Sequence, residues 1–156
     1  MKKLVELLIN KNKTISTMES CTGGCFVNEI TNIEGSSEIL KFSAVTYSNE
    51  YKIKMGVSSN VINKYSVYSI ETAMEMSKSI SKFTNSTYGI GITGKLNRID
   101  KNNLYGSDNK VYISIYDNEL DKFYNYDIQV NKETRKENKE MIVKFIENEL
   151  IKLVVK

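Results

Sequence analysis

The sequence predicts a three-layer α/β/α sandwich with a mixed central sheet. Helices separate the early strands, and a hairpin of two strands closes the series, an order that favours layered α/β packing. The chain has 156 residues, a common size for one folding unit, and we expect a single domain over 1–156. No internal repeat or low-complexity linker divides it.

The first third of the chain predicts alternating helices and strands. Leucine and valine at helical spacing predict a helix over residues 2–10. A strand over 14–19 and a helix over 22–33 follow, and we expect Gly35 to end that helix in the left-handed conformation. The next strand, over 42–47, alternates imperfectly, which favours burial on both faces.

The middle third predicts mainly helices. Their expected ranges are 48–57, 58–66 and 69–83, followed by a strand over 88–94. Ser48 or Asn49 caps the first helix and Gly56 closes it, while Ser69 caps the third. The strand contains a Gly-x-Gly pair, which is weak evidence for a dinucleotide site because no third glycine and no helix follow.

The last third begins with a polar stretch over residues 95–109, which predicts a mobile loop. Strands over 110–116 and 123–130 are joined by a short turn and predict a hairpin. A final helix is expected from about 132 to 153, because apolar residues recur along one of its sides.

The charge and the apolar content of the chain exclude several classes of function. The 22 basic and 19 acidic residues give a net charge of +3 and are spread along the chain, so we expect no nucleic-acid partner. No apolar run approaches the roughly 18 residues of a membrane span. Glu6 and Asn10 interrupt the apolar start of the chain, which therefore reads as a helix rather than a signal peptide, and we expect a cytoplasmic protein with no membrane partner.

The chain contains no histidine and only two cysteines, Cys21 and Cys25. These are too few ligands for a zinc site, and we expect neither a metal nor a disulfide. The simplest interpretation is two buried thiols that act as small apolar groups. Any general base must then be a lysine, a carboxylate, a tyrosine or a water molecule.

The stretch Met18–Gly24, with the sequence MESCTGG, is the strongest candidate for a site. It lies where a buried strand turns into a helix, and its two glycines let the backbone pass close to a ligand. The first amides of the helix suit a phosphate or a developing oxyanion, which makes Ser20 the leading candidate for a nucleophile. The alternative is that Ser20 or Thr22 only caps the helix and that the glycines only form a turn.

Four separated segments closely resemble the C-terminal domain of the competence-inducible protein CinA in their order and spacing. They are Thr17–Gly24 (TMESCTGG), Gly35–Ser37 (GSS), Val45–Val57 (VTYSN, then Lys52 and Gly-Val) and Ile92–Gly94 (ITG). The resemblance covers roughly residues 2–155. Active members of that family are amidases that deamidate nicotinamide mononucleotide, releasing ammonia and leaving nicotinate mononucleotide. The resemblance therefore implies a small-molecule nucleotide substrate and no cofactor.

The resemblance also implies catalytic roles. Ser20 matches the family's nucleophile and Lys52 the lysine thought to activate it, a pairing that amidases use when histidine is absent. From the pattern alone Lys52 reads as a surface charge; as a base it needs a pKa lowered by burial or by a nearby cation. Tyr47 is expected to orient the base or the nucleotide, and Thr93 to hydrogen-bond the substrate amide or phosphate.

Other residues are expected to bind the substrate. Backbone amides near Thr22, Gly23 and Gly24 would form the oxyanion hole, where loss of one donor typically costs about 2.7 to 4 kcal/mol. The remaining expected contacts are Cys21, Ser48, Asn49, Gly94 and Arg135. We carry over no metal requirement from the N-terminal domain to which family members are usually fused. The resemblance is compatible with a homo-oligomer, because family members tend to associate.

The chain departs from the family in three places. Where the family continues with Ile-Ala-Gly-Pro and a glycine-rich loop, residues 95–101 are KLNRIDK, so the loop on the substrate side is rebuilt. Residues 66–69 keep only part of a Gly-Ala-Val-Ser segment. Lys132, Arg135 and Lys136 are candidates to replace an arginine at the last helix, and we assign a phosphate contact to Arg135. The alternative for all three is a solvated helix entry.

Three functions are compatible with these patterns. The first is a nicotinamide-nucleotide amidase that uses Ser20 and Lys52. The second is a family member in which the altered loop has abolished turnover and which binds a nucleotide or a protein partner. The third is a flavodoxin-like phosphate-binding module, which would leave Lys52 without a role.

Overall fold

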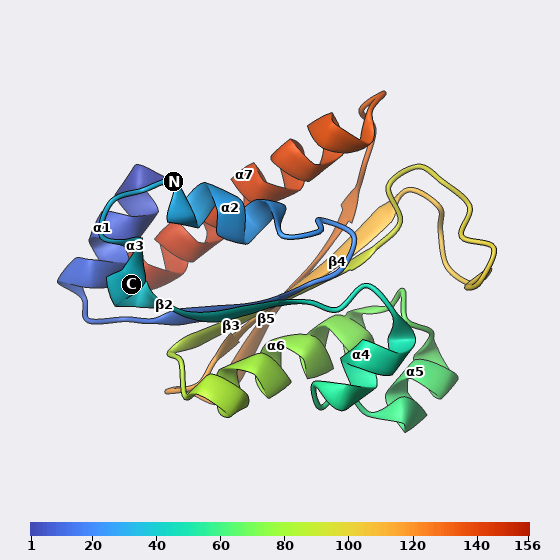
Figure 1. Cartoon of the computed structure of the whole chain (residues 1–156), viewed down its shortest axis with the longest axis horizontal. Helices are drawn as coiled ribbons and strands as arrows, with labels where there is room; N and C mark the ends of the chain where they lie inside the picture. The colour runs from blue at the N-terminus through green and yellow to red at the C-terminus, as the bar shows by residue number, and fades with distance from the viewer.

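Five strands form a single mixed sheet at the centre of the computed structural model, which describes residues 1–156 (Figure 1). The strands are β1 (Ile15–Glu19), β2 (Leu40–Val45), β3 (Tyr88–Gly94), β4 (Lys110–Asp117) and β5 (Lys122–Gln129). Their order across the sheet is β2-β1-β3-β4-β5. β1 lies parallel to β2 and β3, whereas β4 is antiparallel to both β3 and β5.

Helices cover both faces of this sheet, which confirms the predicted three-layer α/β/α sandwich. They are α1 (Lys2–Asn10), α2 (Cys25–Thr31), α3 (Ser36–Ile39), α4 (Asn49–Lys54), α5 (Ser59–Tyr65), α6 (Ile70–Thr84) and α7 (Arg135–Val155). α1, α2, α3 and α7 lie on one face, and α4, α5 and α6 lie on the other (Figure 1). None of these seven helices is both long and apolar enough to cross a membrane.

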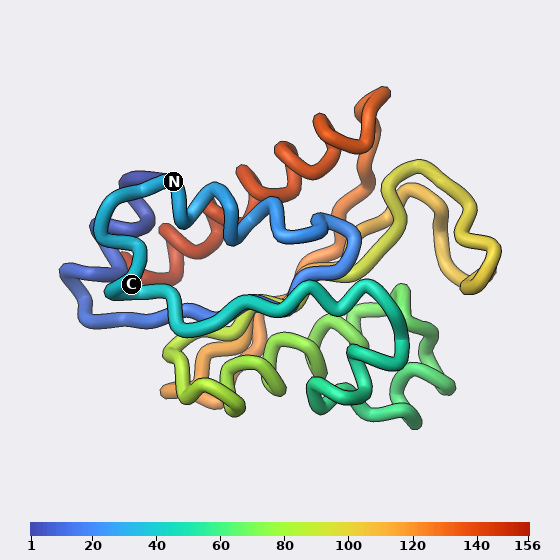
Figure 2. Tube along the Cα trace, viewed as in Figure 1, coloured from blue at the N-terminus to red at the C-terminus, as the bar shows by residue number.

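The trace of the chain places the termini and the longest loop at opposite ends of the molecule. Figure 2 shows the N- and C-termini near one another, while the segment between β3 and β4, residues 95–109, extends from the other end. This loop follows the carboxyl end of β3, so it lies at the same end of the sheet as the turn after β1. The predicted loop boundaries are confirmed.

Apolar side chains fill the space on both faces of the sheet. In the larger core, Phe26 and Ile30 of α2 and Ile142 and Ile146 of α7 are fully buried against the sheet. The smaller core consists of Met18, Val57, Ile62, Val67, Met76 and Ile80. Because burial of apolar surface is the main favourable term in folding, these two cores hold the three layers together.

The Gly-x-Gly pair of β3 lets α6 pack directly on the sheet. A Cβ atom added to Gly89 would lie 2.0 Å from the carbonyl oxygen of Ser77. One added to Gly91 would lie 2.3 Å from the carbonyl oxygen of Ala73. Both distances are far shorter than a van der Waals contact, so these glycines serve helix packing and not a dinucleotide site.

The helix α2 starts later than predicted because of the turn after β1. The helix begins at Cys25 rather than Thr22, because Gly23 (φ 61°) and Gly24 (φ 89°) have left-handed backbone conformations that a right-handed helix excludes. Gly35 is left-handed as expected, but it precedes the short helix α3 and does not end α2, which stops at Thr31.

The strand β2 lies at an edge of the sheet and is only partly covered. It spans Leu40–Val45, and its side chains Phe42 and Val45 are 40 % and 50 % exposed. The prediction that this strand is buried on both faces is therefore wrong: its imperfect alternation reflects an edge position rather than a central one. Tyr47 lies beyond the end of the strand.

Two predicted helix caps are confirmed. The Ser48 side chain accepts a hydrogen bond from the Tyr51 amide at 3.3 Å at the start of α4. The Ser69 side chain accepts one from the Thr72 amide at 3.1 Å at the start of α6. Each serine satisfies one of the amides that have no partner in the first turn of a helix.

We expect the substitution Gly91→Ala to lower the free energy of unfolding by about 3 kcal/mol, because the new methyl group collides with the α6 backbone. Gly35→Ala is the control. Its added Cβ meets only the ends of two side chains, Ile9 at 3.2 Å and Glu38 at 3.6 Å, so the left-handed backbone is the main cost, about 1 kcal/mol. Urea denaturation of both variants measures the difference, and equal losses would contradict the packing role of Gly91.

Candidate active site

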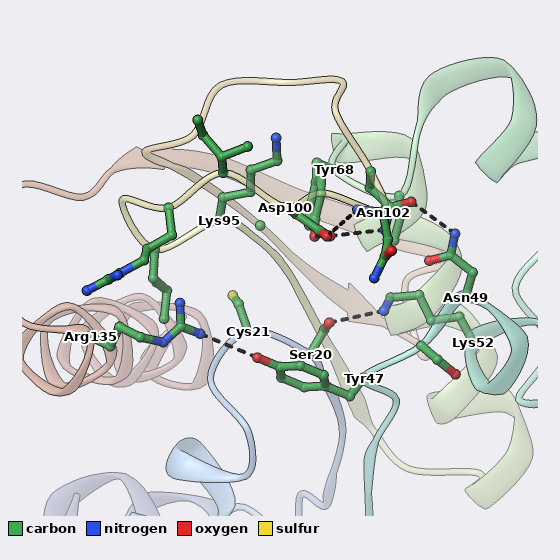
Figure 3. A pocket seen from close by; sticks show the side chains of 17 residues that line it. Ser20, Cys21, Tyr47, Asn49, Lys52, Tyr68, Lys95, Asp100, Asn102 and Arg135 are labelled. Atoms are coloured by element: carbon green, nitrogen blue, oxygen red, sulfur yellow. Dashed lines mark hydrogen bonds between the residues drawn. The ribbon is translucent and has the colours of Figure 1, made fainter.

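A pocket of about 580 Å³ lies at the carboxyl ends of β1 and β3 (Figure 3). The turn after β1 contributes Ser20 and Cys21 to its lining, and the residues around the start of α4 contribute Ser48, Asn49 and Lys52. The 95–109 loop and the first residue of α7 complete the wall. Ligand sites of α/β proteins typically lie at this end of the strands.

Ser20 and Lys52 meet in this pocket although 32 positions separate them in the sequence (Figure 3). The Nζ atom of Lys52 lies 3.0 Å from the Oγ atom of Ser20. The same Nζ atom donates to the carbonyl oxygen of Thr46 at 2.6 Å. The amine and the hydroxyl are therefore within the distance that direct proton transfer requires.

Lys52 is buried, with 1 % of its surface exposed, so its interpretation as a surface charge is wrong. Burial disfavours the charged ammonium form and lowers the pKa of Lys52 from 10.5 to about 8. No carboxylate forms an ion pair with this amine, so no full negative charge offsets the cost of burying the ammonium. A substantial fraction of the lysine is thus neutral near physiological pH and able to accept a proton.

The turn between β1 and α2 presents free backbone amides beside Ser20. The amide of Gly23 donates to the Ser20 carbonyl at 3.0 Å, and the amide of Gly24 donates to the Glu19 carboxylate at 3.1 Å. The amides of Cys21 and Thr22 donate to no protein acceptor. The donors available to an oxyanion are therefore those of Cys21 and Thr22, because the expected contributions of Gly23 and Gly24 are already used.

The interpretation of Ser20 or Thr22 as a simple helix cap is wrong. Neither hydroxyl bonds to an amide of α2. The hydroxyl of Ser20 lies against Lys52, and that of Thr22 is buried with no hydrogen-bond partner. The cap of α2 is supplied instead by Glu19, a residue that the sequence did not single out.

Tyr47 and Arg135 lie together at the edge of the pocket (Figure 3). An Nη atom of Arg135 donates to the Tyr47 hydroxyl at 3.4 Å, and the Tyr47 side chain is 66 % exposed. Arg98, from the 95–109 loop, also lines the pocket. Neither arginine forms an ion pair with a carboxylate, so both are available to an anionic group of a ligand. Lys132 and Lys136 do not line the pocket.

The remaining expected contacts divide into two groups. Cys21, Ser48, Asn49 and Gly94 line the pocket. Burial raises the pKa of the Cys21 thiol to about 12, which keeps this thiol protonated. Thr93 is fully buried outside the pocket and donates to the carbonyl oxygen of Val67 at 2.8 Å, so its hydroxyl does not point at a substrate.

The 95–109 loop supplies contacts that the sequence did not reveal. The Asp100 carboxylate accepts hydrogen bonds from the hydroxyl of Tyr68, the amide of Asn102 at 2.9 Å and the side chain of Asn103 at 3.0 Å. Asn103 in turn accepts from Asn49 at 3.2 Å. The Asp-x-Asn-Asn sequence is typical of a turn closed by an aspartate side chain. This was the only sequence pattern that could have indicated these contacts. These contacts attach the loop to the start of α4.

Lys95 is a second buried lysine in the pocket wall, 3 % exposed. Its amine lies 2.9 Å from the Asp108 carboxylate and 5.1 Å from the centre of the Tyr68 ring. Its side chain extends away from Ser20 (Figure 3). Lys95 is paired with a carboxylate and directed away from Ser20, so only Lys52 has the position required of a base.

Comparison with protein families identifies one match to nearly the whole chain. A family model described as the CinA C-terminal domain matches residues 1–153. A CinA-like protein from Desulforapulum autotrophicum is 45 % identical over 89 residues, which cover 56 % of this chain and 21 % of that protein. A protein described as competence-damage inducible, from Clostridium beijerinckii, is 47 % identical over 92 residues, covering 58 % and 22 %. The matched segments span about a fifth of the length of these relatives.

Solved structures show the same fold. A competence-damaged protein (CinA) superfamily member from Klebsiella pneumoniae has a TM-score of 0.90 at 18 % identity, covering 99 % of this chain and 94 % of that one. A member of the same superfamily from Escherichia coli has a TM-score of 0.88 at 21 % identity, covering 97 % and 87 %. At these identities the likeness concerns the fold alone.

We expect Lys52→Met to make the protein more stable at pH 6, by about 1 to 3 kcal/mol. At this pH the wild-type lysine is charged in the folded and in the unfolded state, so folding includes the full cost of burying the charge. Between pH 8 and 10.5 the folded state loses this proton before the unfolded state does, so wild-type stability should rise with pH relative to the variant. Urea denaturation across this range measures both effects.

Lys54→Met is the matched control for this prediction. Lys54 lies on the same helix but is exposed and pairs with Glu50, so its replacement should change stability by less than about 0.5 kcal/mol. A Lys52→Met variant that is less stable than the wild type at pH 6 would contradict an uncompensated buried charge.

Proposed function

Because the chain belongs to the family of CinA C-terminal domains, we propose that it is an amidase that hydrolyses the carboxamide of nicotinamide mononucleotide. The products are nicotinate mononucleotide and ammonia. The single observation that supports this proposal most directly is the contact between Ser20 and Lys52, in which a hydroxyl lies 3.0 Å from a buried amine whose pKa is lowered to about 8. A serine activated by a neutral lysine is an established arrangement for acyl transfer.

The proposed reaction has two halves. The neutral amine of Lys52 takes the hydroxyl proton of Ser20 as Oγ attacks the carboxamide carbon. The amine then returns this proton to the amide nitrogen, the carbon–nitrogen bond breaks, and ammonia leaves an ester on Ser20. A water molecule next attacks the ester, Lys52 takes one water proton and passes it to Oγ as the bond between Oγ and the carbonyl carbon breaks. The acid that forms loses its remaining proton to solvent and leaves as the carboxylate. Lysine and serine end the cycle unchanged.

The negative charge of each tetrahedral intermediate needs hydrogen-bond donors that are already in place. The amides of Cys21 and Thr22 meet this need, because they belong to the turn that carries Ser20 and have no other acceptor. Preorganised amides in a site shielded from water stabilise such a charge more strongly than water does. The protonated Lys52 adds a cation 3.0 Å from Oγ during the same step.

The cationic side of the pocket suits the phosphate of the substrate. Arg98 and Arg135 line it and are free of carboxylate partners. A guanidinium group donates two parallel hydrogen bonds to phosphate oxygens, which gives both affinity and orientation. Tyr47, held against Arg135, presents an aromatic surface beside Ser20 on which a planar pyridine ring can lie.

The rebuilt loop supports a second candidate, a binding module without turnover. Residues of the 95–109 loop form a large part of the pocket wall, so its altered sequence changes what the pocket admits. In this case the nucleotide would bind but its amide would not reach Ser20. The intact contact between Ser20 and Lys52 favours the enzyme over the binding module.

Purified protein incubated with nicotinamide mononucleotide should release ammonia at the rate at which nicotinate mononucleotide appears. Coupled detection of ammonia together with chromatography of the nucleotides measures both products. Ser20→Ala should lower kcat by roughly a thousandfold or more, because it removes the nucleophile. Activity that persists in Ser20→Ala would refute the proposed nucleophile. Saturable nucleotide binding without ammonia release would establish the binding module instead.

The rate should depend on the ionisation of Lys52. Because the neutral amine is the base, kcat/KM should increase about tenfold per pH unit below pH 8 and level off above it. A pH–rate profile from 6 to 10 measures this dependence, and thermal denaturation at each pH excludes unfolding as its cause. A profile that is flat, or that declines between pH 6 and 8, would contradict a lysine base.

A further inference from the structure

Glu19 is a fully buried carboxylate that the proposed reaction does not use. It is the last residue of β1 and directly precedes Ser20. A carboxylate is expensive to bury unless hydrogen bonds replace its lost hydration. The partners of this carboxylate therefore indicate what it does in the fold.

Those partners are three backbone amides at the start of α2. The carboxylate accepts hydrogen bonds from Gly24 at 3.1 Å, Phe26 at 3.2 Å and Val27 at 2.9 Å. The side chain of residue 19 thus reaches across the whole turn of residues 20–24 and closes it into a ring. It also satisfies amides that lack partners within the first turn of the helix.

The backbone of Glu19 connects the same turn to the general base. Its carbonyl oxygen accepts a hydrogen bond from the Thr46 amide at 2.8 Å. The carbonyl oxygen of Thr46 accepts from the amine of Lys52 at 2.6 Å, and this amine lies 3.0 Å from Ser20. Glu19 is therefore hydrogen-bonded through its side chain to the turn that presents the nucleophile, and through its backbone to the segment that holds the base.

We infer that Glu19 is a positioning residue, whose carboxylate holds the turn in the one shape that places the Ser20 hydroxyl beside Lys52. The same bonds occupy the amides of α2 and leave those of Cys21 and Thr22 free to face an oxyanion. The inference rests on the proposed function for its kinetic consequence. The contact between Ser20 and Lys52 can be measured without turnover.

Glu19→Gln tests this inference with little change in side-chain volume. The new amide group presents N–H donors to backbone amides that are themselves donors, so at least one of the three hydrogen bonds is lost. Asp117→Asn is the matched control. Asp117 is also a buried carboxylate, 6 % exposed, and accepts from the amides of Glu119 at 3.0 Å and Leu120 at 3.1 Å, but it lies at the β4–β5 hairpin.

The first measurement is the pKa of Lys52, which is obtained from a pH titration of the NMR signals of its ε-methylene group. Loosening of the turn should admit water to the amine and raise the pKa of Lys52 by at least one unit from about 8 in Glu19→Gln. The Cys21 thiol, the titratable group that acts on this amine, is unchanged in both variants. In Asp117→Asn the pKa of Lys52 should stay at its wild-type value. An unchanged pKa of Lys52 in Glu19→Gln would overturn the inference.

The second measurement is the hydrolysis of nicotinamide mononucleotide. Glu19→Gln should lower kcat about a hundredfold and change KM less than threefold, because the pocket side chains that bind the nucleotide are intact. Asp117→Asn should lower the melting temperature but leave kcat within twofold. Loss of activity in proportion to loss of stability in both variants would show a merely structural role.

The two measurements separate failure of the inference from failure of the proposed function. A wild-type protein that releases no ammonia refutes the amidase, while the titration of Lys52 still decides whether Glu19 sets the contact with Ser20. If Glu19→Gln does not fold, Glu19→Asp replaces it. This variant keeps the charge, but its side chain is one methylene shorter and cannot span the turn, so the same shift in the pKa of Lys52 is expected.

Discussion

The burial of the Lys52 amine without a carboxylate partner is the constraint on which the site depends. A buried ammonium is costly, and the protein meets part of that cost with the carbonyl oxygen of Thr46 and the hydroxyl of Ser20. Neither group is a full negative charge, so the pKa of Lys52 falls to about 8 and far more of the neutral amine is present than in an exposed lysine. Pairing with an aspartate, as Lys95 has with Asp108, would have fixed the charge instead.

The sheet and the helices supply the framework for this contact. Parallel pairing of β1 with β2 and β3 brings the carboxyl ends of these strands to the same end of the sheet. The turn after β1 and the segment before α4 therefore become neighbours. Ser48 then caps α4 and fixes the helix on which Lys52 lies one turn later. The absence of side chains at Gly89 and Gly91 lets the α6 backbone pack directly on the other face of the sheet.

The sequence predicted the fold class, the hairpin and the caps because each depends on local patterns: alternation of apolar residues, turn residues and hydroxyls before helices. The turn between a strand and a helix already made Ser20 a candidate nucleophile, but Lys52 was predicted only through the resemblance, since a lone lysine near a helix end looks like a surface charge. The sequence did not predict the Glu19 cap, the direction of Thr93 or the contact of Asp100 with Tyr68. These depend on backbone conformations such as that of Gly24 and on juxtapositions that form only in the folded chain.

The attachment of the 95–109 loop has a consequence for how such proteins diversify. The loop joins two sheet strands and forms a wall of the pocket, while the proposed nucleophile, base and oxyanion donors all come from earlier segments. Insertions, deletions and substitutions in one contiguous stretch of the gene can therefore change which molecule is admitted without disturbing the chemistry behind it. Exchange of the 95–109 loop between homologues is therefore a direct route to new substrate selectivity while the rest of the site stays the same.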